Sequence, residues 1–166
     1  MTKHVIEGPA FNPVSGKSEG RAKLRVLFIC THNSARSQMA EGYINANYRD
    51  RFEAFSGGTE ITRGHPLAIT VMKEIGIDIS GYRSKLIDEF LDRKVDTVIT
   101  VCDDARKACP FFPGARETIH VTFPDPSSCK GTQAECLAQF RQVRDAIFSW
   151  IDTTFVPGFR EKLPVS

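Results

Sequence analysis

The feature that most constrains the fold is the alternation of short apolar runs with segments of helical periodicity. The first run is rich in large and β-branched residues, which is typical of a buried parallel strand. The expected strands are Leu24–Ile29, Phe52–Phe55, Val95–Val101 and Thr118–Phe123. The expected helices run from about Ser37 to Tyr48, from Pro66 to Gly76, over Leu86–Leu91, and from a capping box at Thr132 to Ile151. This alternation predicts the α/β class, with a four-stranded parallel sheet and helices on both faces.

Length and composition are typical of one globular domain. The chain has 166 residues, 41% of them hydrophobic, which is enough for a single buried core. The longest apolar stretch, Val26–Cys30, has strand length and cannot span a membrane. A net charge of +2 excludes binding to nucleic acid by bulk neutralisation of phosphates. Residues 1–23 form a polar leader that we expect to be flexible, and residues 24–166 form the domain.

A polar loop between the first strand and the first helix is the strongest candidate site. The N–H groups of such a loop can converge on one point, and the helix adds positive potential at its N-terminus. The Arg36 guanidinium can hold two oxygens of a tetrahedral oxyanion, and the same field favours the thiolate form of Cys30. Ser37 is placed to donate a hydrogen bond to that thiolate. The predicted binding residues around Cys30 and Arg36 are Thr31, His32, Asn33, Ser34, Ala35 and Ser37. The alternative is a buried cysteine beside a solvated arginine.

The stretch from Val26 to Glu41 resembles the phosphate-loop signature of the low-molecular-weight tyrosine phosphatase superfamily, and more narrowly its arsenate reductase branch. The resemblance covers about residues 24–155 and implies the fold of that superfamily. Many relatives have glycine at the position of His32. If the backbone there has a positive φ, histidine adopts it with a small cost in conformational free energy. A few hold potassium through residues that align with Asn33, Glu41, Ser56 and an aspartate. The aspartate position is Lys85 here, and we hypothesise that its ammonium takes the place of the cation.

Two further cysteines, Cys102 and Cys109, follow the third expected strand on a segment without a strong helical pattern. Thiols on a loop can pass a disulfide on by successive attack. Arsenate reductases carry this pair, whereas the phosphatases lack it. Cys129 and Cys136 are expected to stay reduced, Cys136 in the core and Cys129 exposed. Because the closely spaced ligand pairs of a zinc site are missing, neither a metal nor another cofactor is predicted.

An Asp-Pro sequence at residues 125–126 follows the last expected strand. If its pKa rises beside a bound dianion, Asp125 can protonate a departing oxygen. The resemblance places the general acid of the family here, and a plain Asp-Pro turn is the alternative. Phosphatases usually continue with tyrosine, but this chain has Ser127, which argues against a phosphotyrosine pocket.

Taken together, the resemblance implies a cytoplasmic arsenate reductase. Cys30 would attack arsenic, Cys102 would attack Cys30 of the adduct and release arsenite, and Cys109 would take over the disulfide. A thioredoxin or glutaredoxin would restore the thiols, with neither nucleic acid nor membrane as partner. One alternative is a phosphatase of aryl or small phosphate esters that uses Cys30, Arg36 and Asp125 alone. The other is a non-catalytic oxyanion-binding or redox-sensing module.

Overall fold

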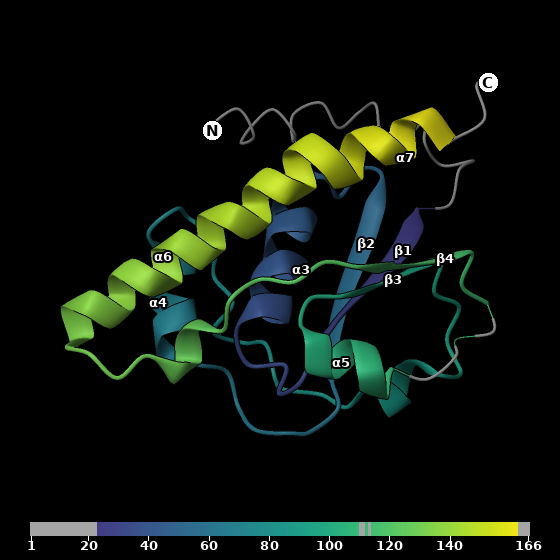
Figure 1. Ribbon diagram of the computed structural model, residues 1–166. Helices are drawn as coiled ribbons and strands as arrows, with labels where there is room; N and C mark the ends of the chain where they lie inside the picture. The colour runs from purple at the N-terminus through teal and green to yellow at the C-terminus, as the bar shows by residue number, and fades with distance from the viewer. Residues whose placement is uncertain (1–22, 110–111, 113, 163–166) are drawn as a thin grey trace.

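Four parallel strands form the sheet, in the order β2-β1-β3-β4 (Figure 1). The computed structural model describes residues 23–109, 112 and 114–162, so all of the predicted leader except Lys23 lies outside the described residues. The strands are β1 (Leu24–Cys30), β2 (Phe52–Gly58), β3 (Thr97–Thr100) and β4 (Glu117–His120). The predicted class and strand number are confirmed. The fourth strand is shorter than predicted, yet Val121 and Phe123 still donate N–H hydrogen bonds to the end of β3, which keeps the chain extended toward Asp125.

The helices lie close to their predicted places, although several differ in length or kind. They are α3 (Arg36–Asn47), α4 (Pro66–Lys73), the 3₁₀ turn η1 (Ile87–Phe90), α5 (Asp103–Ala108), the 3₁₀ turn η2 (Pro126–Ser128), α6 (Gln133–Trp150), the π-helical η3 (Ile151–Phe155) and α7 (Val156–Lys162). The helix expected over Leu86–Leu91 is only η1, because one turn is enough to bury Ile87 and Phe90. The segment between Cys102 and Cys109 holds α5, although a loop was expected.

The last helix continues well beyond its predicted end. It begins at the expected capping box of Thr132 and Glu135 and runs on through η3 into α7. Pro157 lies just after the π-helical segment. A proline ring clashes with the carbonyl one turn earlier in a regular helix, and a wider π turn relieves that clash. No helix in the described part of the chain is long and apolar enough to cross a membrane.

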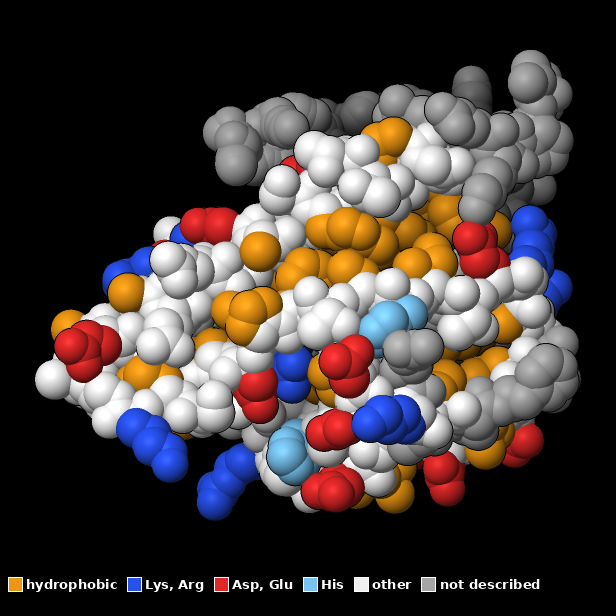
Figure 2. Space-filling view, viewed as in Figure 1, with side chains coloured by type: hydrophobic (Ala, Val, Ile, Leu, Met, Phe, Trp, Pro, Cys, Tyr) orange, Lys and Arg blue, Asp and Glu red, His pale blue; other side chains and the backbone are white. Residues whose placement is uncertain are grey.

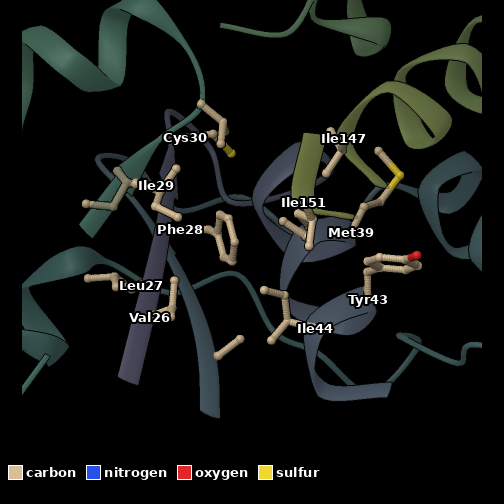
Figure 3. Packing of buried hydrophobic residues seen from close by; sticks show 14 of the residues in the cluster. Val26, Leu27, Phe28, Ile29, Cys30, Met39, Tyr43, Ile44, Ile147 and Ile151 are labelled. Atoms are coloured by element: carbon tan, nitrogen blue, oxygen red, sulfur yellow. The ribbon is translucent and has the colours of Figure 1, made fainter. Parts of the chain in front are cut away.

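Helices cover both faces of the sheet, as predicted. Figure 3 shows Phe28 of β1 pointing toward α3, while Leu27 and Ile29 point to the opposite side. All three side chains are at most 1% exposed, so neither face of β1 contacts water. On the second face, Phe55 of β2 packs against Phe90 of η1, with ring centroids 5.7 Å apart. Figure 1 shows α6, η3 and α7 on one side of the strands and α5 on the other.

An apolar groove runs between β4 and the long last helix. Figure 2 shows hydrophobic side chains gathered in this hollow. The residues that line the groove are Ile119, His120, Val121, Trp150, Thr154, Phe155, Gly158 and Phe159. None of the predicted site residues belongs to this lining, so the groove is separate from the candidate active site.

Candidate active site

The predicted oxyanion loop lies at the carboxyl ends of the central strands. Cys30 is the last residue of β1, and Arg36 is the first residue of α3. In open parallel sheets, ligands bind beyond this edge, where neighbouring connections diverge. Ala35 is buried directly before α3, and His32 lies at the surface with its Nε2 3.1 Å from Oε1 of Glu60. The whole loop is therefore presented at the edge where the sequence predicted chemistry.

Hydrogen bonds inside the loop direct a hydroxyl at the nucleophile. Asn33 Nδ2 donates to Ser37 Oγ at 2.9 Å, and that oxygen lies 2.9 Å from Cys30 Sγ. Since the Ser37 oxygen accepts from Asn33, its own hydrogen is available for the sulfur, as predicted. Asn33 is the only described non-glycine residue with a positive φ, at 53°. The strained position is thus Asn33 and not His32, and asparagine tolerates it well.

Long-range hydrogen bonds hold the loop carbonyls outward. The carbonyl oxygens of Thr31, His32 and Ser34 all accept hydrogen bonds from other segments. The donors are the N–H groups of Thr59, Glu60 and His65 and the hydroxyl of Ser84, at 2.7–2.9 Å. With the carbonyls turned away, the loop N–H groups remain for an anion. The sequence analysis missed these supporting residues, because nothing local marks a side chain or N–H that acts on a distant loop.

Glycine at the end of β2 lets the loop pass close by. A Cβ on Gly58 would lie 2.7 Å from the carbonyl oxygen of Thr31 and 2.9 Å from the backbone nitrogen of Asn33. Real Cβ atoms do not approach so closely, so any larger residue would displace the loop. From the sequence, Gly58 indicates only the end of a strand. The tertiary structure shows that its missing side chain also leaves room for the oxyanion loop.

Arg36 and Asp125 face each other across the site. Arg36 is only 8% exposed, and its Nη1 donates to the carbonyl oxygen of Phe123 at 3.0 Å. Its Nη2 lies 3.6 Å from Oδ2 of Asp125, whose other oxygen accepts from the N–H and hydroxyl of Ser127. Partial burial raises the pKa of the Asp125 carboxyl, but the hydrogen bonds from Ser127 and the charges of Arg36 and His32 outweigh it and hold this pKa below its ordinary value. The predicted rise therefore requires a bound anion.

Cys102 lies against the oxyanion loop, and Cys109 lies at the far end of α5. The buried Cys102 has its Sγ 3.5 Å from Thr31 Oγ1. Burial raises the pKa of the half-buried Cys109 thiol. The loop expected between these cysteines is wrong: an acidic first turn favours α5, and Asp103 there is held by His120 Nε2 at 3.1 Å.

Cys129 and Cys136 form a disulfide, so the expectation of two reduced thiols is wrong. Cys136 is buried at 8% exposure, as predicted. Cys129 was expected to be exposed, but the chain after η2 folds back and brings it onto the start of α6. The described cysteines outside this disulfide are Cys30, Cys102 and Cys109, the three that the sequence analysis assigned to the relay.

Lys85 extends its ammonium toward a largely buried carboxylate beside the loop. Its Nζ lies 4.0 Å from Oε1 of Glu41 and donates to the carbonyl oxygen of Arg83 at 3.1 Å. The Ser56 hydroxyl donates to the same Glu41 oxygen, and the Lys85 N–H donates to Asn33 Oδ1. Burial raises the pKa of Glu41 and lowers that of Lys85. Of the residues that align with potassium ligands, Glu41 lies beside the ammonium, Asn33 is bonded to the Lys85 backbone, and Ser56 is bonded to Glu41; the replacement of the ion by Lys85 stays a hypothesis.

The fold and the loop define a class of protein. A cysteine at the end of a parallel strand and an arginine at the start of the next helix, joined by an anion-binding loop, characterise cysteine-dependent phosphatases and their relatives. Residues 25–153 match the family described as low molecular weight phosphotyrosine protein phosphatase. The chain belongs to that family.

Within the family, the chain is most usefully compared with arsenate reductases. It is 44% identical over 128 residues to an arsenate reductase of Halalkalibacterium halodurans, covering 77% of this chain and 92% of the relative. A solved arsenate reductase in a phosphate-binding state has a TM-score of 0.67 and 34% identity, covering 78% of this chain and 94% of its own. A thioredoxin-dependent arsenate reductase of Corynebacterium glutamicum has a TM-score of 0.54 and 25% identity, covering 86% of this chain and 72% of its own.

Proposed function

We infer that this protein reduces arsenate to arsenite with electrons from its own cysteines. The observation that carries this conclusion is the position of Cys102, whose sulfur lies 3.5 Å from a side chain of the oxyanion loop. A phosphatase needs one cysteine there, whereas a reductase needs a second thiol within reach of the first. The likeness to curated arsenate reductases supports the same conclusion.

Arsenate binds in the loop, with its oxygens on the backbone N–H groups and on Arg36. The Cys30 thiolate, stabilised by the Ser37 hydroxyl at 2.9 Å, attacks arsenic, and an oxygen departs. Asp125 donates the proton that turns this leaving group into water. Its ordinary tendency is to be ionised, because its pKa is held down in the free protein. The incoming dianion offsets the Arg36 charge and raises the pKa of Asp125, so substrate binding itself causes the carboxylate to take up the proton that it later donates.

Arsenic receives both electrons in one step, in which the sulfurs of Cys30 and Cys102 become a disulfide. Cys102 attacks the sulfur of Cys30, the sulfur–arsenic bond breaks, and its electron pair leaves with arsenite. Cys109 attacks Cys102 and releases Cys30 as a thiolate, which leaves a Cys102–Cys109 disulfide. Burial keeps the Cys109 thiol protonated at rest, so this step requires the α5 segment to open.

A dithiol protein of the thioredoxin class is the proposed reductant. It reduces the Cys102–Cys109 disulfide to two thiols and becomes a disulfide itself. The two electrons that it supplies equal those used to reduce one arsenate. We place the reaction in the cytoplasm, where such dithiols are maintained.

The experiment maps cysteine pairing by mass spectrometry after one equivalent of arsenate. The expected product is a Cys102–Cys109 disulfide with one arsenite released, and Cys102→Ser stops arsenite release at the Cys30 adduct. Release of phosphate from an aryl ester that survives Cys102→Ser, without arsenite formation by the wild type, would support the phosphatase instead. Anion binding with no change in any cysteine would support the non-catalytic module.

A further inference from the structure

The Cys129–Cys136 disulfide joins the segment that carries Asp125 to the core of the domain. Cys129 is the residue that ends η2, and Cys136 lies in the first turns of α6. Helix α6 is itself firmly anchored, since Phe140 and Ile147 are each 1% exposed. The disulfide therefore fixes the end of η2 to a rigid element.

Asp125 moves together with η2 because several hydrogen bonds connect it to the residues of that turn. Its carboxylate accepts from the Ser127 N–H at 2.9 Å, and its carbonyl oxygen accepts from the Ser128 hydroxyl at 3.0 Å. The N–H of Cys129 donates to the carbonyl oxygen of Pro126 at 3.2 Å. These bonds make residues 125–129 one small unit, with the acid at one end and the disulfide at the other.

On the site side, Asp125 is held only loosely. The nearest distance to Arg36 is 3.6 Å, longer than a hydrogen bond, and the carboxylate side chain is 41% exposed. Arg36 Nη1 donates instead to the carbonyl oxygen of Phe123. Arg36 itself is buried, but a single ion pair at this distance, with its carboxylate partly open to water, contributes little to order. The covalent connection to α6 is consequently the stronger constraint on where the acid lies.

We propose that Cys129 and Cys136 are positioning residues for arsenate reduction: their disulfide holds the unit of residues 125–129 so that Asp125 stays over the oxyanion loop. The proposal rests on the role of Asp125 in the proposed function. When a dithiol reduces the bond, two electrons and two protons convert it into two thiols, and the dithiol becomes a disulfide. Asp125 then loses its fixed position, and the reaction slows.

A double-mutant cycle tests the proposal through single-turnover arsenite release. The protein is purified without reductant, and alkylation mapping verifies that Cys129 and Cys136 form a disulfide and that the other cysteines are reduced. The variant Cys129→Ser/Cys136→Ser removes the bond without leaving a stray thiol, and Lys130→Ala serves as a control in the same loop. We expect arsenite release to be about tenfold slower. This loss is smaller than the whole rate enhancement of about 10²–10⁴-fold that a positioned general acid supplies. In an Asp125→Asn background the same two substitutions should change nothing.

An equal loss in the Asp125→Asn background would overturn the proposal, because the disulfide would then act on stability alone. So would an unchanged rate in the wild-type background, or mapping that finds two thiols at positions 129 and 136. If the wild type releases no arsenite, the proposed function fails, and the positioning role is decided by hydrogen exchange. Opening the bond in the wild type with dithiothreitol should speed amide exchange in residues 125–132 and leave α4 unchanged, and equal exchange before and after opening refutes the positioning role.

Discussion

A proline in α5 should favour the oxidised form of the relay. Helix α5 covers Asp103–Ala108, so Cys102 and Cys109 lie seven residues apart across it. At 1.5 Å per residue that is about 10 Å along the axis, whereas a disulfide needs Cα atoms within about 7 Å. The helix must therefore unwind before Cys109 can bond to Cys102, and its stability opposes oxidation.

The magnitude follows from the small number of bonds in α5. In a six-residue helix only the N–H groups after the first turn have a partner one turn earlier, and Lys107 supplies one of them. Lys107→Pro removes that bond and adds a clash, at a cost of up to about 3 kcal/mol that falls on the reduced protein alone. The equilibrium constant for the Cys102–Cys109 disulfide should rise by up to about 10²-fold.

The assay is a redox titration against oxidised and reduced dithiothreitol, followed by alkylation and mass spectrometry. Lys107→Ala, which keeps the N–H and removes the exposed side chain, should titrate close to the wild type. The Cys129–Cys136 disulfide serves as an internal reference and should not shift. A Lys107→Pro protein that titrates like the wild type would refute the requirement that α5 unwinds.

Four further predictions concern the loop, the acid, the buried ion pair and the core. Arg36→Lys should weaken phosphate binding about 10²-fold, measured by titration calorimetry, because a single ammonium cannot replace a planar fork; an unchanged affinity would place the anion elsewhere. Asp125→Asn should slow single-turnover arsenite release by about 10²-fold. The pKa of this carboxyl is depressed in the folded protein, so the ionised carboxylate stabilises the fold above the unfolded value near 3.8, and this stabilisation is lost as the pH falls. Below pH 4 the urea midpoint of Asp125→Asn should therefore change less with pH than that of the wild type. Burial raises the pKa of Glu41, so stability falls as the pH rises above 4.5, and Lys85→Met should make this fall larger than in the wild type because Lys85 no longer lowers that pKa. Added potassium should restore the urea midpoint of the variant, and a potassium-dependent wild type would contradict the replacement of the ion. Phe140→Ala should lower the free energy of unfolding by about 3–5 kcal/mol, and a loss below 1 kcal/mol would show that the site collapses around the cavity.

Local patterns were enough to predict the sheet and the loop. The apolar run that becomes β1 and the helix that follows are each encoded within about a dozen residues, so Cys30 and Arg36 were placed by their neighbours in the chain. The same holds for the capping box at the start of α6. The short helix α5 escaped detection, because six residues are too few for a periodicity to repeat and its first residue, Asp103, is held by the distant His120.

The sequence by itself determined which residues end the central strands, and parallel pairing then brings those ends to one edge. Only the tertiary structure decided what supports them: the outward hydrogen bond from Ser84 to the loop, the close approach at Gly58 and the bond between Cys129 and Cys136. The physical reason is that periodicity reports which face of an element is buried and carries no information about its partner. Contacts between segments far apart in the chain depend on how the elements pack, and the packing exists only once the core has formed.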